Sequence, residues 1–261
     1  MRQCRNIGAA LLLAAGVFVW GSDPNLADAG HPWPFPENPL IAIPGGAFVF
    51  GADDGEENEK PRQTIEIPGF TVNRTEITNA EYRRFVVEGQ GRASNFDRHP
   101  ELGKDDRPVV GVSWDDADAF CRFYGLKLPT EQQFERAARG ATGRKYAWGD
   151  APATPDRVSR GSETCCGPDA ADGFPATAPV GSFPKGNTPE GVADLTGNVW
   201  EWMDGWYNPY GTPPAAEDKT YRVLRGGAWN SDDWKLRTTY RLAYRGDFRY
   251  AANGGFRCVG P

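Results

Sequence analysis

All of the helix signals in this 261-residue chain fall between residues 78 and 140. Each begins with Thr or Ser, has an acid or amide three residues later, and ends at a glycine. These patterns predict three short helices, over 78–88, 113–124 and 130–139. After residue 140 the sequence shows only short strand patterns, loops and many aromatic residues. With 32 Gly and 22 Pro, most of the backbone is expected in short strands, turns and irregular loops.

Strands are expected before the first helix. Residues 47–51, 64–67 and 70–72 have the apolar and β-branched composition of strands. Residues 53–60 read as a polar, acidic loop, and the Pro-rich stretch over 31–44 reads as extended chain.

The N-terminus has the pattern of an export signal. Arg2 and Arg5 precede an apolar run over 7–20 that is short for a membrane span, and residues 27–29 (ADA) fit a cleavage site. We therefore expect a signal peptide over 1–29 and a periplasmic or secreted protein that meets the membrane only through the cleaved signal. An uncleaved membrane anchor is the alternative.

Removal of that signal would leave an even number of cysteines in an oxidising compartment. Cys121 lies on the apolar face of the second predicted helix and Cys258 lies near the C-terminus. A bridge between them would close most of the chain into one loop, worth about 4–5 kcal/mol in the chain-entropy model. Cys165 and Cys166 are adjacent, and adjacent cysteines bridge only with strained geometry. Two unbridged thiols are the alternative for that pair.

The segment over 194–202 (DLTGNVWEW) places a Gly-Asn turn between two carboxylates. The side chains of Asp194 and Glu201 and the carbonyls of Gly197 and Val199 would offer four oxygens to a hard cation such as Ca²⁺. The alternative is a β-turn between surface acids, followed by a half-buried strand whose tryptophans face the core.

The charge and the histidine count argue against several kinds of site. The net charge of −6 argues against a nucleic-acid surface. Two histidines, His31 and His99, are too few for a centre held by several imidazoles. The sequence also has no Gly-rich phosphate loop, nucleophile elbow or Cys-x-x-Cys pair.

Eight short motifs follow one another along the chain: GGAF at 45–48, TEITN at 75–79, PVVGVSW at 108–114, LPTE at 128–131, YAWG at 146–149, GNVWEW at 197–202, RGGAW at 225–229 and GFRC at 255–258. In this order they resemble the formylglycine-generating enzyme (sulfatase-modifying factor) family. The resemblance implies a single α+β domain of C-type-lectin-like fold over 43–261, after a Pro-rich segment over 30–42. It also places Cys121 and Cys258 at the positions of a family disulfide.

The resemblance implies two structural calcium sites. The first uses the four groups of residues 194–201 named above. The second uses the side chain of Asp172 and the carbonyl of Phe174, with Ser159 in place of the usual Asn and the Arg160 carbonyl beside it.

The family's copper chemistry is not expected here. Formylglycine-forming members bind copper through two cysteines after the Arg-Gly-Gly motif, because thiolates suit Cu(I). In this chain Ser231 stands at the first position and Lys235 or Leu236 at the second. We therefore expect no copper there and no copper-dependent formylglycine synthesis. A sulfoxide-forming branch needs an extra helical domain with histidine ligands, and this sequence contains none.

The pocket implied by the alignment has aromatic walls and a few polar groups, as is typical of a site for a peptide or a flat ring. Its expected wall residues are Trp200, Trp229, Trp234 and Arg237, and its candidate catalytic residues are Ser231, Asp232, Tyr240 and Arg241. The alternative is that the tryptophans belong to the core and the arginines pair with internal acids.

Two functions are compatible with these features. One is an exported maturation factor that oxidatively modifies a peptide, peptide-derived or protein substrate. In that case Cys165 and Cys166 could form a redox pair, and any other redox cofactor is unidentified. The other is a non-catalytic, calcium-stabilised binding or assembly module.

Overall fold

The structure is a computed structural model that describes residues 33–89, 91–162, 165–168, 170–249 and 251–261, with side chains for all of these except 162, 165–168, 170 and 214. The expected signal peptide over 1–29 lies outside the described residues. Within the described ranges, no helix is both long enough and apolar enough to cross a membrane.

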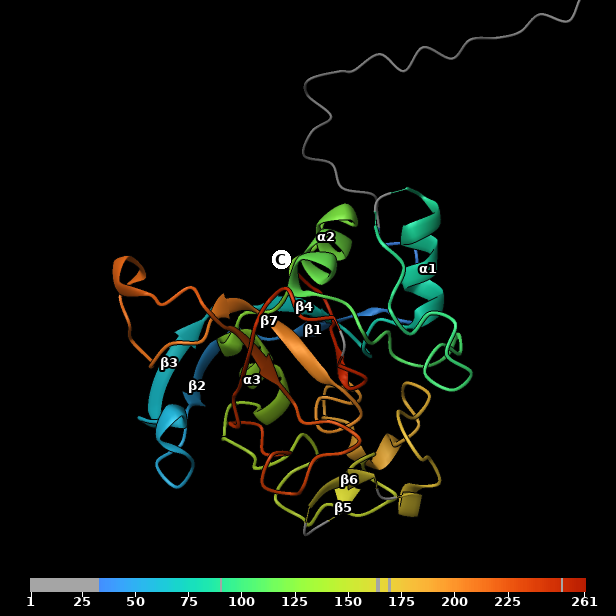
Figure 1. The fold of residues 1–261 in the computed structure, drawn as a ribbon. Helices are drawn as coiled ribbons and strands as arrows, with labels where there is room; N and C mark the ends of the chain where they lie inside the picture. The colour runs from blue at the N-terminus through green and yellow to red at the C-terminus, as the bar shows by residue number, and fades with distance from the viewer. Residues whose placement is uncertain (1–32, 90, 163–164, 169, 250) are drawn as a thin grey trace, which may run out of the picture.

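The three helices form where the capping patterns predict them. α1 spans Asn79–Val87, α2 spans Trp114–Phe123 and α3 spans Glu131–Arg139. In each helix the cap side chain accepts a hydrogen bond from the backbone N–H three residues on, and the acid or amide there accepts one from the cap backbone. Figure 1 shows α1 and α2 side by side at one end of the molecule.

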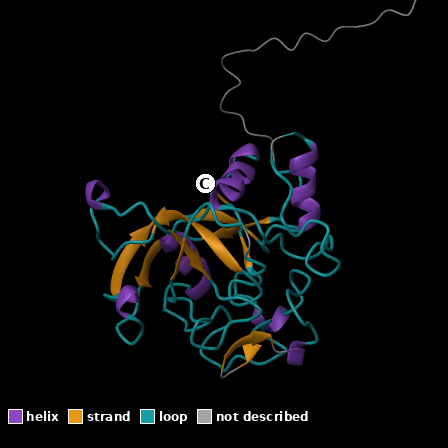
Figure 2. Cartoon of the chain, in the orientation of Figure 1, coloured by secondary structure: helices purple, strands orange, loops and turns teal. Residues whose placement is uncertain are grey.

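The strands of the described residues are short and form four small sheets (Figure 2). β1 (Leu40–Ile43), β4 (Phe70–Asn73) and β11 (Val259–Gly260) pair antiparallel in that order. β2 (Gly46–Phe50) pairs with β3 (Gln63–Ile67), and β5 (Gly161–Ser162) with β6 (Cys165–Pro168). The fourth sheet has the order β10 (Gly254–Gly255), β7 (Trp200–Trp206), β8 (Arg222–Arg225) and β9 (Leu242–Tyr244). Short 3-10 turns lie at Glu57–Glu59, Ala170–Asp172, Pro184–Gly186 and Pro214–Ala216.

The Pro-rich segment is part of the folded domain. β1 pairs with β4 over its whole length. Upstream of β1, Trp33 and Phe35 lie edge-on to Tyr124 at the end of α2, with ring centroids 5.8 and 5.2 Å away. The domain therefore includes residues ahead of position 43, where the resemblance would begin it.

An aromatic core joins the first two helices to the C-terminal segment. Phe120 of α2 lies edge-on to Phe85 of α1 and to Phe256, with ring centroids 5.4 and 5.3 Å apart. Beside it Cys121 and Cys258 form a disulfide, with an S–S distance of 1.97 Å, across 137 residues of chain. Closing a loop of that length restricts the unfolded chain by about 4–5 kcal/mol in the chain-entropy model.

The first four residues of β7 are buried on both faces of the strand, and both of its edges are paired, with β10 and with β8. Trp200, Glu201, Trp202 and Met203 are all buried, and Glu201 has no exposed surface. The alternative of a half-buried strand with an acid at the surface is therefore wrong.

Candidate functional site

The turn at Gly197 and Asn198 is fixed from two sides. Both residues have positive φ, 85° and 61°. A Cβ on Gly197 would lie 2.4 Å from the carbonyl oxygen of Ser159, so only glycine fits. The amide of Asn198 accepts a hydrogen bond from the backbone N–H of Ala178 at 2.9 Å and donates to its carbonyl at 3.4 Å. The turn therefore holds its position before β7 begins at Trp200.

Three buried acids, Asp194, Glu201 and Glu76, interact beside this turn. Arg257, also fully buried, donates from Nε and Nη2 to the two oxygens of Glu201 at 2.7 and 2.8 Å. Asp194 accepts the backbone N–H of Gly181 at 2.6 Å. Within the described part of the chain, no donor reaches either carboxylate oxygen of Glu76.

This group of four side chains, the acid cluster, holds more negative charge than its arginine can balance. Burial, and next the charge of Asp194, raise the pKa of Glu76 well above its usual range. Burial also raises the pKa of Asp194 and of Glu201, although Arg257 opposes both shifts. With all three acids ionised, two negative charges would stay uncompensated in a buried site, which is costly. A bound divalent cation would neutralise them.

The donor atoms of the acid cluster suit calcium, which takes carboxylate and carbonyl oxygens. In the described chain no three His, Cys, Asp or Glu side chains are arranged to hold a metal ion by themselves. The expected carbonyls of Gly197 and Val199 would therefore have to complete the set. Glu76, which the sequence analysis missed, fits as a further ligand because it lies against the carboxyl of Asp194 and no N–H of the described chain reaches its oxygens.

The second expected calcium set is engaged only in part, because the hydroxyl of Ser159 is buried and makes no hydrogen bond in the described structure. Asp172 accepts the backbone N–H of Phe174 at 2.8 Å. The carbonyl of Ser159 accepts the N–H of Asn198 at 3.0 Å, and the guanidinium of Arg160 donates to the next carbonyl along the chain at 2.7 Å. The argument from uncompensated charge therefore applies to the first set only.

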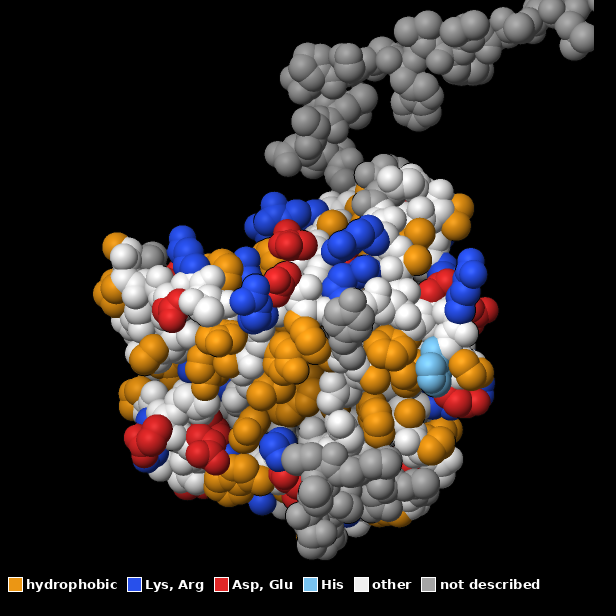
Figure 3. Space-filling view, viewed as in Figure 1, with side chains coloured by type: hydrophobic (Ala, Val, Ile, Leu, Met, Phe, Trp, Pro, Cys, Tyr) orange, Lys and Arg blue, Asp and Glu red, His pale blue; other side chains and the backbone are white. Residues whose placement is uncertain are grey.

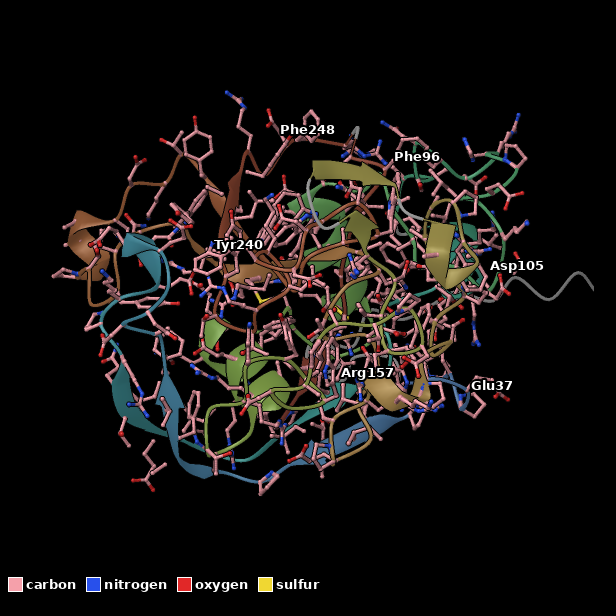
Figure 4. The ribbon with its side chains drawn as sticks, turned by 90° about the horizontal axis from the view of Figure 1, so that it is seen from below. Glu37, Phe96, Asp105, Arg157, Tyr240 and Phe248 are labelled. Atoms are coloured by element: carbon pink, nitrogen blue, oxygen red, sulfur yellow. A yellow bond between two sulfur atoms is a disulfide. The ribbon has the colours of Figure 1, made fainter. Side chains whose placement is uncertain are left out.

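A cavity of about 420 Å³ opens beside β7. Aromatic rings form much of its wall. Its lining consists of Val112, Trp200, Trp202, Leu224, Trp229, Asn230, Leu242, Tyr244, Phe248, Ala251, Ala252, Asn253 and Gly254. Figure 3 shows hydrophobic side chains gathered near the middle of one face of the molecule. Figure 4 shows Phe248 close to an edge of the molecule and Tyr240 among the inner side chains.

Hydrogen bonds fix the polar ends of this aromatic cavity. The indole of Trp229 donates to the carbonyl of Ala252 at 3.1 Å, and the indole of Trp202 donates to Val112 at 3.2 Å. Asn253 donates to the side chain of Asn230 at 2.8 Å. The walls are thus positioned before any ligand arrives.

The structure brings only part of the expected pocket together. Trp200 and Trp229 line the aromatic cavity, and Tyr240 lies against Trp200 with ring centroids 5.9 Å apart. Trp234 and Arg237 line a separate hollow of about 310 Å³. There the guanidinium of Arg237 lies 3.7 Å from the ring centroid of Trp234.

The four candidate catalytic residues are held in structural contacts, and none of them lines the aromatic cavity of the described structure. The hydroxyl of Ser231 is buried and closes its own turn. Asp232 pairs with the lysine three residues on. Arg241 donates from Nε and Nη2 to Glu131, both at 2.7 Å. Burial raises the pKa of Tyr240, which disfavours its anion. Cys165 and Cys166 begin β6, and their side chains lie outside the described part.

A second buried group of charges, the arginine cluster, surrounds α3. Arg225 donates to Glu131 at 2.7 Å and to Glu135 at 2.6 Å. Arg139 pairs with Glu135 at 2.7 Å, and Arg241 pairs with Glu131. Each acid here contacts two guanidinium groups.

The α+β fold with few helices and the order of the eight sequence motifs are those of a sulfatase-modifying-factor-type domain. The chain belongs to the sulfatase-modifying factor enzyme 1-like domain family, whose model matches residues 30–260.

Several relatives cover most of the chain. It is 32% identical to the inactive Cα-formylglycine-generating enzyme 2 of Mus musculus, over 84% of this chain and 85% of the relative. It is 32% identical to the formylglycine-generating enzyme of Streptomyces coelicolor, over 84% of this chain and 88% of the relative. The hercynine oxygenase of Mycolicibacterium smegmatis is 28% identical, over 84% of this chain and 61% of the relative. The family therefore includes oxidative enzymes as well as a protein named inactive.

Solved structures share the fold of this chain. PvdO from Pseudomonas aeruginosa superposes with a TM-score of 0.70 at 21% identity, over 85% of this chain and 93% of PvdO. The Treponema denticola variable protein 1 superposes with a TM-score of 0.68 at 22% identity, over 85% of this chain and 94% of that protein. The predicted single α+β domain of C-type-lectin-like fold is confirmed.

Proposed function

We propose that this protein is a calcium-stabilised binding module, whose aromatic cavity receives an aromatic or apolar side chain of a peptide or protein partner. The observation that carries the proposal is the composition of the cavity wall. It combines fixed aromatic rings with the amide pair of Asn230 and Asn253, and such walls bind flat or apolar groups. Among its described lining residues only Tyr244 carries a group that titrates, which favours binding over acid–base chemistry.

Two further points support a role without turnover. The four residues expected to be catalytic make structural contacts instead, as described above. The relative from Mus musculus is named inactive, so loss of catalysis has a precedent among similar chains.

In this proposal a bound calcium ion makes the wall of the aromatic cavity more rigid. Asp194, Glu201, Glu76 and the carbonyls of Gly197 and Val199 would hold the ion, and Ca²⁺ would supply charge neutralisation. The same turn leads directly into Trp200, a wall of the cavity. Metal binding would therefore order the wall. Export through the signal over 1–29 would bring the protein to a compartment rich in calcium and free of thiol reductants.

A second candidate is an exported maturation factor that oxidises a peptide or protein substrate. Its support is the similarity to relatives named formylglycine-generating enzyme and hercynine oxygenase. The cavity side chains supply no redox group, so this function would need a redox cofactor or the Cys165–Cys166 pair.

Calorimetric titration with N-acetyl-phenylalaninamide, and with N-acetyl-alaninamide as the matched probe, tests the binding proposal. We expect the phenylalanine probe to bind at least about tenfold more tightly. Trp229→Ala should remove that preference, whereas Trp234→Ala, in the separate hollow, should keep it. Equal binding of both probes would contradict the proposal. Peptide-dependent oxygen uptake that disappears in Cys165→Ser/Cys166→Ser would favour the maturation factor.

A further inference from the structure

Arg222, on β8, is held between two tryptophans. Its guanidinium carbon lies 3.5 Å from the ring centroid of Trp114 and 3.5 Å from that of Trp206. Trp114 is fixed because its indole donates to the carbonyl of Met203 at 2.8 Å. Trp206 is fixed because it pairs with Arg222 across β7 and β8. Both flat faces of the guanidinium are therefore covered, and only its edge remains open.

Four acids, Asp204, Asp115, Asp118 and Glu217, act on the charge of this guanidinium without bonding to it in the described structure. In the described part of the chain, no hydrogen bond or ion pair engages the guanidinium of Arg222. The buried Arg225, Arg241 and Arg257 differ, because each donates two bonds to carboxylates. A guanidinium of fixed orientation presents a planar fork of donors that matches a carboxylate. Stacking on both faces removes much of the entropy that a free arginine would lose on binding.

The edge of Arg222 faces a hollow of about 340 Å³. Lys219 and Thr220 line it with the two tryptophans. Gly246 forms part of its floor, and a Cβ there would lie 3.1 Å from the Cγ of Arg222. Glycine at this place thus leaves the arginine stem in position.

The other charges around the hollow set the kind of anion that it suits. Arg245 is paired with Asp247 at 2.9 Å, so the two cancel. Asp115 is an exposed acid on the rim, opposite in charge to Lys219, and Asp204, Asp118 and Glu217 also act on the charge of Arg222. A singly charged carboxylate meets less repulsion from these acids than a doubly charged phosphate would.

This hollow and the aromatic cavity share one wall, the segment 244–248. Tyr244 and Phe248 line the aromatic cavity, while Arg245, Gly246 and Asp247 line the hollow. Tyr244 is also the strand partner of Arg222 between β9 and β8. Figure 3 shows Lys and Arg side chains next to the central hydrophobic patch.

We propose that Arg222, with its Trp114–Trp206 stack, is a carboxylate-binding subsite, so that the partner is an acidic peptide with an aromatic or apolar side chain close to an Asp, a Glu or its own C-terminus. This inference rests on the proposed binding function and names the class of its ligand. The aromatic side chain enters the cavity, the chain crosses the segment 244–248, and the carboxylate meets the edge of Arg222.

The test uses the full chain and four series of peptides, acetyl-X-(Gly)n-Z-amide, with X as Phe or Ala, Z as Asp or Asn, and n from zero to three. Calorimetry at low salt gives each affinity. For at least one spacer length we expect the Asp peptide to bind about tenfold more tightly than its Asn twin, a difference of one strong charge-assisted pair. Arg222→Gln should remove this preference and keep the preference for Phe over Ala. Arg245→Gln, on the same rim, should keep both preferences.

The Arg222→Lys variant is the control for a folding defect, since it keeps the charge but loses the planar fork of donors. Its preference for Asp should fall between those of the wild type and Arg222→Gln at an unchanged melting temperature. Equal affinities of Asp and Asn peptides at every spacer length would overturn the carboxylate subsite. A lost preference for Phe with a retained preference for Asp would instead overturn the aromatic cavity and leave Arg222 as an anion site. Inorganic phosphate that competes better than acetate would overturn the assignment to carboxylates.

Discussion

The two buried charge clusters are both built from arginines and acids, but they differ in the sign of their excess charge. In the arginine cluster, three guanidinium groups surround Glu131 and Glu135, and each acid has two partners. In the acid cluster, Arg257 serves Glu201 alone, while Asp194 has a backbone donor and Glu76 has no donor in the described structure. In the first cluster every carboxylate oxygen has a donor and the arginines outnumber the acids by one, whereas the second needs a cation or a proton.

The difference shows which buried charges are scaffold and which form a site. A buried carboxylate that already has donors at both oxygens does not attract a cation. Uncompensated charge of one sign, in contrast, creates an affinity for the opposite sign. The following changes test that distinction.

The largest effect is expected for Arg257→Met. This change removes the only guanidinium that contacts Glu201 and leaves three acids in a buried site. We expect a loss of about 3–5 kcal/mol in the free energy of unfolding, measured by chemical denaturation. Excess calcium should restore part of the loss.

Arg225→Met is the matched change in the arginine cluster. Glu131 keeps Arg241 and Glu135 keeps Arg139, so the loss should be smaller and calcium should not restore any of it. Equal losses in the two variants, both insensitive to calcium, would remove the distinction between the clusters.

Calcium itself should stabilise the wild type. At about a hundredfold excess over its Kd, a ligand that binds only the folded state adds about 2.7 kcal/mol, visible as a higher melting temperature. Glu76→Gln and Asp194→Asn should abolish the response, and Glu131→Gln should keep it. A Glu76→Gln variant with the full calcium response would exclude Glu76 as a ligand.

The metal-free protein should lose stability as the pH rises. A carboxyl group whose pKa is higher in the folded state binds its proton more tightly there, so its contribution is present at low pH and is lost above the unfolded pKa. For Glu76 that loss begins near its ordinary value of 4.5. Melting temperatures in a chelator should fall from pH 4.5 to pH 8, less steeply in Glu76→Gln. Saturating calcium should flatten the wild-type curve, and a curve that stays steep would count against the cation.

The smallest effect concerns Glu81, a buried acid without an arginine. Burial raises its pKa to about 7, while the backbone N–H of Thr78 donates to it at 2.7 Å in the capping box. Glutamine also serves in that box. Glu81→Gln should therefore keep α1 and show a smaller fall in melting temperature between pH 4.5 and pH 7 than the wild type. Parallel curves for the two proteins would contradict the raised pKa.

Local structure could be predicted from the sequence because its causes act within a few residues. Thr78, Ser113 and Thr130 each start a helix through a hydrogen bond that reaches three positions. The strand expected over 47–51 is β2, displaced by one residue. The motifs added the overall fold, since their order matches a family of known architecture.

The charge contacts could not be predicted, because they join residues that are far apart in the chain. Residues 53–60 read as a polar, acidic loop, yet Glu59 within it has no exposed area and pairs with Arg237 across 178 residues. That pair holds Arg237, and the indole of Trp234 stacked on it, in the separate hollow rather than beside Trp200. For Glu76 the sequence offered one signal, which is its place within the TEITN motif at 75–79. Its neighbour in that motif, Ile77, is fully buried in the structure.

A seven-residue segment next to the C-terminus decides when folding can finish. Residues 254–260 supply β10, Phe256 of the aromatic core, Arg257, the disulfide partner Cys258 and β11. β11 lies in one sheet with β1, near the start of the folded domain. A chain that emerges from a ribosome or a translocation channel in order, N-terminus first, cannot assemble this core until residues 254–260 have emerged. The core is therefore completed only after nearly all of the domain has left the channel.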